Sequence, residues 1–133
     1  MTITTNARVA GFTFWIYFAA GIGSMLLAGN APATGVLTLV TSFCALLLGV
    51  TLYAITRDED PDLAMLALTC RVGEGLVGAS MPTTLALLWL ATTTGPGAPD
   101  PAAAHALGEF LLKLGDWQTL ISATLFAVGS TLF

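Results

Sequence analysis

Four long apolar segments, separated by short polar ones, dominate the pattern of this chain. They run from about residue 9 to 28, 35 to 56, 62 to 94 and 117 to 133. A helix that crosses the hydrocarbon core of a bilayer needs about 20 apolar residues, because each residue adds 1.5 Å. The first three segments meet this length, and the fourth reaches its lower limit. The pattern predicts four transmembrane helices.

The third segment is longer than one crossing requires, and it contains a proline at position 82. A helix in this situation tilts, extends beyond the bilayer or bends, and proline favours a bend because it has no N–H to donate. We therefore expect one of these three adjustments within residues 62–94.

Two Asp-Pro pairs predict where helices begin. Asp60 precedes Pro61, and Asp100 precedes Pro101. An aspartate at the N-cap accepts a hydrogen bond from a free backbone N–H, and proline fits the first helical position. Before the second pair, residues 95–101 read Gly-Pro-Gly-Ala-Pro-Asp-Pro, which predicts a non-helical loop.

Residues 101–114 predict a short amphipathic helix at the membrane surface. One face is apolar and consists of Leu107, Phe110, Leu111 and Leu114. Another is polar and consists of His105, Glu109 and Lys113, spaced four residues apart. We expect Gly115 to end this helix, Asp116 to cap the last span and Trp117 to lie at the interface.

The composition agrees with lipid as the solvent. Of the 133 residues, 56% are hydrophobic and only 9% are charged, whereas soluble domains carry about 25% charged residues. The mean hydropathy is +0.85. A net charge of −4 argues against nucleic acid as a partner. The sequence predicts an all-α integral membrane protein, a helix bundle in one domain over residues 1–133, with four transmembrane helices and one short amphipathic surface helix.

The few basic residues predict the orientation in the membrane. Arg8 precedes the first span and Arg57 follows the second. The positive-inside rule therefore places the N-terminus in the cytoplasm, with the chain crossing the membrane several times. An alternative treats residues 1–33 as a signal peptide cleaved after Ala31-Pro32-Ala33. Its apolar run of about 20 residues exceeds the roughly 7–15 of a signal peptide, which favours a retained helix.

Arg71 and Glu74 are the most informative residues, because they lie inside the third apolar segment. A charge at the centre of a bilayer costs about 2.5–3.5 kcal/mol on insertion scales. Residues three apart on a helix share a face, so the two side chains can neutralise each other. The small residues Gly75, Gly78 and Ala79 follow closely, and small residues let membrane helices pack tightly. We expect this face to point into the bundle.

The Arg71–Glu74 pair has two interpretations. In the first, it is a structural ion pair that fixes the register of the helices. In the second, Arg71 anchors an anionic ligand or a lipid head group, and Glu74 serves as counter-ion or proton carrier.

The remaining polar residues indicate no chemistry. His105 belongs to a solvated face, and the acidic cluster of Asp58, Glu59, Asp60 and Asp62 is explained by helix capping and solvation. Cys44 and Cys70 lie in apolar runs without metal-ligand spacing. We find no catalytic set, no metal site and no cofactor motif, so nothing identifies an enzyme.

In order along the chain, three motifs resemble the bacterial membrane family called domain of unknown function 4386. These are residues 7–11 (Ala-Arg-Val-Ala-Gly) before an aromatic-rich span, Arg71-Val-Gly-Glu74, and Asp116-Trp117. The resemblance implies a multi-span helical protein without an assigned activity. Members usually have about six spans, so it also implies that this chain is a short or truncated member.

The leading functional hypothesis is a non-enzymatic component of a membrane assembly, whose partners are the lipid bilayer and either another membrane protein or further copies of itself. The alternative is a small transporter, or a protein that binds an anionic ligand or lipid through Arg71 and Glu74. A lipid-modifying enzyme has the least support.

Overall fold

The computed structural model describes residues 2–27, 29–79 and 81–133, and all regular structure within these ranges is helical. The expected all-α fold is thus confirmed. The helices are α1 (Ile3–Leu26), α2 (Ala31–Thr56), α3 (Pro61–Gly78), α4 (Met81–Thr92) and α5 (Pro101–Leu132).

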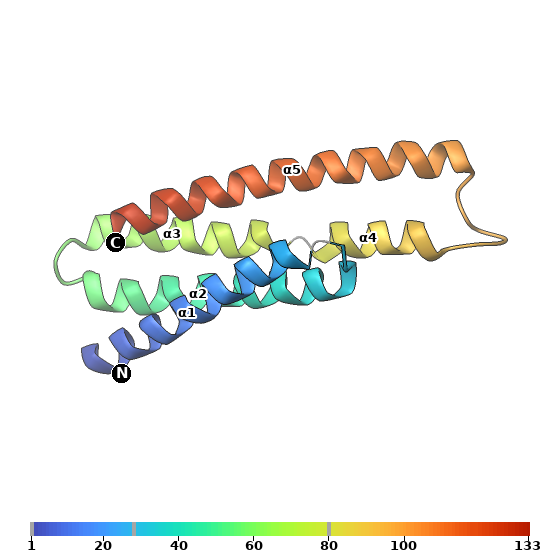
Figure 1. Cartoon of the computed structure of the whole chain (residues 1–133). Helices are drawn as coiled ribbons and strands as arrows, with labels where there is room; N and C mark the ends of the chain where they lie inside the picture. Colours follow the sequence, from blue (N-terminus) through green and yellow to red (C-terminus); the bar gives the residue numbers. More distant parts are fainter. Residues whose placement is uncertain (1, 28, 80) are drawn as a thin grey trace.

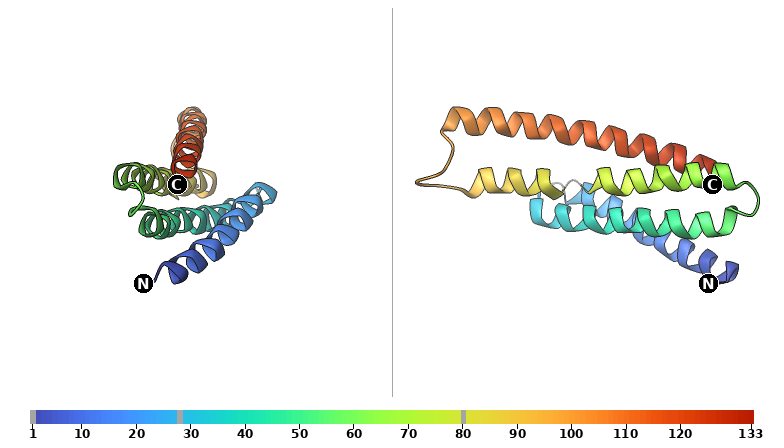
Figure 2. Two further views of the ribbon diagram at one scale, coloured as in Figure 1. Left: turned by 90° about the vertical axis from the view of Figure 1, so that its left-hand side faces the viewer. Right: turned by 180° about the vertical axis from the view of Figure 1, so that it is seen from behind.

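α1, α2, α3 and the second part of α5 lie beside one another, and α4 with the first part of α5 extends beyond them at one end (Figure 1). α2 packs between α1 and α3, and α5 packs along α3 and α4. α4 continues the line of α3 beyond the turn that joins α1 to α2 (Figures 1 and 2). Both termini and the α2–α3 loop lie at one end of the bundle, whereas the α4–α5 loop lies at the other.

Both Asp-Pro pairs begin helices as predicted. The Oδ1 of Asp60 accepts hydrogen bonds from the backbone N–H groups of Asp62 and Leu63, at 3.1 and 3.0 Å. The Oδ1 of Asp100 accepts from Ala102 and Ala103, at 2.9 and 3.0 Å. Between α4 and α5, Gly95 and Gly97 have positive φ angles of 92° and 105°, which glycine adopts without strain.

The long third segment forms two helices, α3 and α4, whereas one tilted, extended or bent helix was expected. α3 ends at Gly78, with Ala79 as its C-cap, and α4 begins at Met81. Residue 80 lies outside the described residues. In a continuous helix the carbonyl of Gly78 would accept from the N–H of residue 82, and proline has none. The helix therefore ends at Gly78.

The expected helix end at Gly115 was wrong. α5 runs unbroken through Gly115, so residues 101–114 and 117–133 belong to one helix. A glycine inside a helix costs only about 1 kcal/mol, and good helix formers surround this one. The helices that contain the first two apolar segments begin before those segments. α2 begins at Ala31, where Asn30 is its N-cap and accepts from the N–H of Ala33 at 3.2 Å. α1 begins at Ile3, capped by Thr2, and ends at Leu26; its expected end at residue 28 lies outside the described residues.

Among the described residues, two helices are long and apolar enough to cross a membrane: α1, and residues Pro32–Thr56 of α2. Their most apolar windows are only 17% and 33% buried within the protein. Large apolar side chains therefore face outward, for example Phe12 and Trp15, which are 70% and 77% exposed. The buried core consists mainly of small residues such as Ala45, Ala64 and Ala67.

Candidate polar site in the bundle

Arg71 and Glu74 form an ion pair inside the bundle. Both side chains project from the same face of α3, and the Arg71 Nη1 donates to the Glu74 Oε2 at 2.7 Å. The two residues are only 1% and 3% exposed. The expectation that this face points inward is confirmed.

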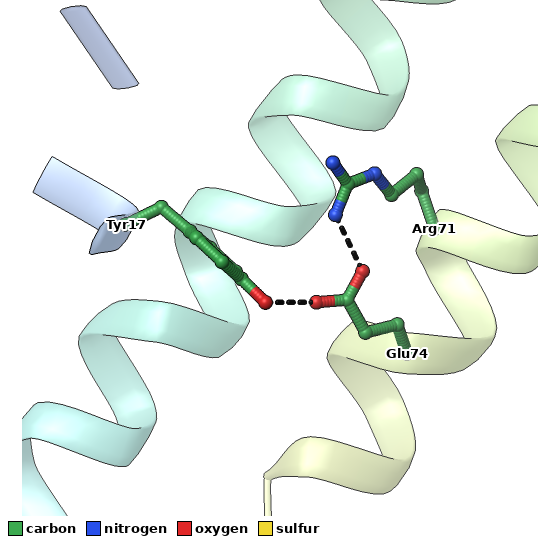
Figure 3. A network of polar contacts seen from close by, with 3 residues as sticks. All are labelled: Tyr17, Arg71 and Glu74. Atoms are coloured by element: carbon green, nitrogen blue, oxygen red, sulfur yellow. Dashed lines mark hydrogen bonds and ion pairs between the residues drawn. The ribbon is translucent and has the colours of Figure 1, made fainter. Parts of the chain in front are cut away.

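Tyr17 from α1 completes the polar contacts of the carboxylate. Its hydroxyl donates to the Glu74 Oε1 at 2.6 Å, so each carboxylate oxygen has one donor (Figure 3). A buried carboxylate needs such donors because it has lost its hydration. Tyr17, Glu74 and Arg71 together are called the polar cluster below.

Two aromatic rings cover the guanidinium of Arg71. Its central carbon lies 4.7 Å from the ring centre of Phe126 on α5 and 5.8 Å from that of Tyr17. The two rings stack on each other with centres 5.5 Å apart and an angle of 6° between their planes. A cation above an aromatic face is stabilised by about 2 kcal/mol when it is desolvated. The rings thus offset part of the burial cost of the charge.

Glycines on the neighbouring helices make room for the Arg71 side chain. A Cβ on Gly49 of α2 would lie 2.9 Å from the Arg71 Cβ, and one on Gly129 of α5 would lie 3.4 Å from its Cγ. Because backbone glycines approach on both sides, α2, α3 and α5 can close around a long charged side chain.

The predicted packing residues contact other helices of the same chain. A Cβ on Gly75 would lie 3.0 Å from Leu46 of α2, and one on Gly78 would lie 3.2 Å from the Oγ of Ser122 on α5. Ala79 is instead the residue that caps α3. The small-residue face of α3 is therefore occupied within the protein.

Two cavities border the polar cluster from opposite ends of the bundle. A polar cavity of about 220 Å³ is lined by the second half of α1, the first half of α2, α3 and α5, and it reaches Tyr17 and Glu74. An apolar groove of about 600 Å³ is lined by the first half of α1, the second half of α2 and the end of α5, and it reaches Arg71. The cluster separates the two spaces.

The other residues considered from the sequence make no polar contact with the cluster. His105 and Glu109 are 3.9 Å apart and more than 70% exposed, as a solvated face requires. Cys44 and Cys70 are buried free cysteines. Within the described ranges, no three His, Cys, Asp or Glu side chains gather where a metal ion could be held.

The sequence did not reveal the partners of the ion pair. Tyr17 was visible only as one member of an aromatic-rich segment, and Phe126 as one apolar residue of the last span. Gly49 ends an Ala-xxx-Gly packing motif, which is common in a chain so rich in small residues. None of these signals points to Arg71.

Comparison with known proteins decides the family. The family model described as domain of unknown function DUF4386 matches residues 27–133. This chain belongs to the DUF4386 family. The match covers α2 to α5 and begins after α1, so Tyr17 lies outside it while Arg71, Glu74 and Phe126 lie within it. No curated protein and no solved structure gives a match. The resemblance seen in the sequence is confirmed, and the DUF4386 family carries no assigned function.

Proposed function

We propose that this protein crosses the bacterial inner membrane four times, through α1, α2, α3 and the second part of α5. The apolar surfaces of α1 and α2 support lipid contact, because a helix in the core of a soluble protein would be buried. α3 has 18 residues and spans about 27 Å, which suits one crossing. α4 and the first part of α5 then extend beyond the bilayer.

The positions of the charges support a cytoplasmic N-terminus. Arg8 near the start of α1 and Arg57 after α2 belong to the end of the bundle that holds both termini. Asp100, His105, Glu109 and Lys113 belong to the opposite end, on the part of α5 that projects beyond α1 and α2. The positive-inside rule places the arginine-bearing end in the cytoplasm.

Within this arrangement we assign the protein a ligand-binding or transport role at the polar cluster. The observation that carries this proposal is the polar cavity, which lies within the proposed membrane region and ends on Tyr17 and Glu74. Ionisable residues inside a membrane mark ligand or ion pathways by default. A purely structural ion pair has no need of a polar cavity beside it.

A role as an assembly component remains the second candidate. That hypothesis was motivated by the abundance of small residues and by the expected amphipathic surface helix. α2 and α5 of the same chain already pack on the small-residue face of α3, at Gly75 and Gly78. The geometry therefore favours ligand binding over partner binding at α3.

The experiment that tests ligand binding uses two matched glycine variants on α1. Gly21 lines the polar cavity and Gly11 lines the apolar groove. An added Cβ meets nothing within 4 Å at either position. Gly21→Leu should fill the polar cavity and Gly11→Leu should leave it open, and both proteins should fold.

Thermal unfolding of the reconstituted protein is then measured with three solutes of similar size and different charge: 1-propanol, propionate and propylammonium. A ligand at 100 times its Kd stabilises the native state by about 2.7 kcal/mol. We expect at least one solute to stabilise the wild type and Gly11→Leu, but not Gly21→Leu. Equal responses of all three proteins to every solute would contradict ligand binding in this cavity.

A further inference from the structure

The apolar groove lies where α1 and α5 do not pack on each other. Among the described helices, α1 packs closely on α2, whereas α5 packs on α3 and α4. The groove is lined by Phe14 and Trp15 of α1, Leu48 of α2 and Ser130 of α5, among others, and Arg71 is its lining residue from α3. Its volume of about 600 Å³ falls within the 300–1,000 Å³ typical of ligand sites.

Arg71 has a hydrogen-bond donor that the protein leaves without an acceptor. In the part of the chain that the structure describes, its Nε is the one buried side-chain nitrogen or oxygen that has no hydrogen-bond partner. Figure 3 shows the Nη1 directed at Glu74, and the other two guanidinium nitrogens lie on the side away from the carboxylate. A buried donor without an acceptor costs free energy, so the Nε indicates a partner outside the protein.

The other polar side chains of the groove are donors as well. They are the Trp15 indole and the Ser130 hydroxyl, and neither donates to a described residue. Of the lining side chains, only Ser130 can also accept. The last carbonyls of α5 lack helical partners, but none of them accepts from the Arg71 Nε. The groove therefore favours a ligand that brings acceptors to Arg71 and Ser130.

The charge of the site favours a neutral ligand. Arg71 and Glu74 already neutralise each other, since their side chains form an ion pair at 2.7 Å. An anion would add an uncompensated charge among apolar side chains, and the loss of its hydration would be costly. A cation such as an ammonium group would bring further donors and no acceptor.

The depth of Arg71 excludes the ester groups of ordinary membrane lipids. Arg71 lies ten residues after Pro61, the first residue of α3, which is about 15 Å along the helix. In the proposed four-crossing arrangement, this is near the middle of a hydrocarbon core about 30 Å thick. Lipid esters lie at the edge of the core. An acceptor at this depth belongs to a molecule whose polar group dissolves in the core itself.

We propose that a lipid-soluble quinone binds in the apolar groove, with its ring carbonyls as the acceptors for Arg71 and Ser130. A quinone is neutral and has two carbonyl oxygens and no N–H or O–H group, which complements the donors of the groove. Its flat ring can stack on an aromatic face such as that of Phe14 or Trp15. This inference rests on the proposed membrane crossings and goes beyond the proposed role of the polar cavity.

Equilibrium binding of a radiolabelled decyl-benzoquinone to the protein in nanodiscs tests this inference, with empty nanodiscs to subtract partition into lipid. Gly11→Leu adds a side chain on the helix face of Phe14 and Trp15, where the quinone ring would lie. We expect saturable binding to the wild type and at least a tenfold loss in Gly11→Leu. The matched variant Gly21→Leu adds the same side chain in the polar cavity and should bind the quinone as the wild type does.

Two competitors with the same chain test what the groove recognises. Decylbenzene has no acceptor, and decanoate carries a negative charge. We expect neither to displace the quinone at comparable concentration. Displacement by decylbenzene would show that the groove binds any apolar chain, and displacement by decanoate would show a fatty-acid site. Either result would overturn the inference.

Removing a donor tests the role of the carbonyls. Ser130→Ala should weaken quinone binding about fivefold, the usual effect of one neutral hydrogen bond. Thr131→Val is the control, because the Thr131 hydroxyl donates to the Ala127 and Val128 carbonyls and does not line the groove. Its affinity should equal that of the wild type. Equal affinities of Ser130→Ala and the wild type would contradict recognition of a carbonyl at this position.

The outcomes separate this inference from the proposed function. If the quinone shows no saturable binding while a small solute still distinguishes Gly21→Leu from the wild type, the polar cavity binds a ligand and the quinone inference is wrong. If the quinone binds and Gly11→Leu abolishes it while no small solute distinguishes Gly21→Leu, the inference stands and the role of the polar cavity is wrong.

Discussion

Single residues explain how a charged arginine lies inside an apolar bundle. Arg71 has an acid on its own helix, an aromatic ring from α1, another from α5, and glycines beside it on α2 and α5. The acid was predictable from sequence, because the i, i+3 relation depends on helix geometry alone. Tyr17 was not, since it lies 57 residues before Glu74 and reaches it only through the packing of α1.

The ion pair makes a prediction about stability. Glu74→Gln leaves the buried Arg71 charge without its counter-ion, and breaking a buried pair costs about 3–5 kcal/mol. The double variant Arg71→Gln, Glu74→Gln removes both charges and should lose clearly less than the sum of the two single changes. Unfolding in mixed micelles measures all three free energies. Additive losses would show that the two side chains are not coupled.

Exchanging the two charges tests the role of the aromatic rings. The double variant Arg71→Glu, Glu74→Arg attaches a carboxylate to the residue whose side chain now packs against the Phe126 ring. It also removes the carboxylate that accepts the Tyr17 hydrogen bond. We expect a loss of about 2 kcal/mol or more, from the cation–π contact and the hydrogen bond together. The same micelle assay applies. A loss below about 1 kcal/mol, as for an exposed ion pair, would show that the surroundings do not discriminate between the charges.

Gly49 provides a further prediction. In Gly49→Ala the new Cβ would lie 2.9 Å from the Arg71 Cβ, so α2 and α3 must separate. Overpacking of this kind costs about 1–3 kcal/mol. Gly11→Ala is the control, because its Cβ meets nothing within 4 Å, and it should be neutral or slightly stabilising. Thermal unfolding that ranks the two variants equally would contradict close packing at Gly49.

At the scale of the helices, the two Asp-Pro pairs predicted helix starts, whereas Gly115 did not predict a helix end. The Asp60-Pro61 and Asp100-Pro101 pairs act through hydrogen bonds within one turn, and both begin helices. Gly115 was expected to end a helix. Glycine lowers helix stability by only about 1 kcal/mol, however, and the residues on either side favour a helix strongly enough to continue it. Pro82 has a stronger effect because it removes a donor outright, and α3 ends four residues before it.

Replacing this proline should extend α3. Pro82→Ala restores an N–H that can donate to the Gly78 carbonyl, and it removes a helix-interior cost of about 3 kcal/mol. We expect the amide of residue 82 to exchange its hydrogen slowly in the reconstituted protein. Fast exchange at that amide would show that α3 ends at Gly78 for a reason other than the proline.

Apolar and charged side chains occupy separate regions of the molecule. The apolar exterior is concentrated on the helices that the sequence identified as spans, and the charges lie at the two ends and in the polar cluster. Hydropathy predicted the all-helical fold, and two of the helices, α1 and residues Pro32–Thr56 of α2, are long and apolar enough to cross a membrane. The two cavities could not be predicted, because each depends on residues from at least three helices.

Labelling from each side of the membrane tests the proposed topology. In a background with Cys44→Ala and Cys70→Ala, Asp58→Cys and His105→Cys introduce single exposed thiols at opposite ends of the bundle. We expect a membrane-impermeant maleimide to label position 105 in intact spheroplasts and position 58 only after the membrane is opened. Labelling of both positions from the same side would contradict the four-crossing arrangement.

The contact between Tyr17 and Glu74 has a consequence for biosynthesis. In the proposed four-crossing arrangement, α3 would carry a charge pair into the membrane, and each charge on its own opposes insertion by about 2.5–3.5 kcal/mol. Ribosomes make α1 and α2 first, so the Tyr17 hydroxyl and Gly49 are already present when α3 follows. Phe126 and Gly129 arrive only with α5, the last helix to be made. In this arrangement the α1–α2 hairpin would help the charged helix to insert, and α5 would later complete the enclosure of Arg71.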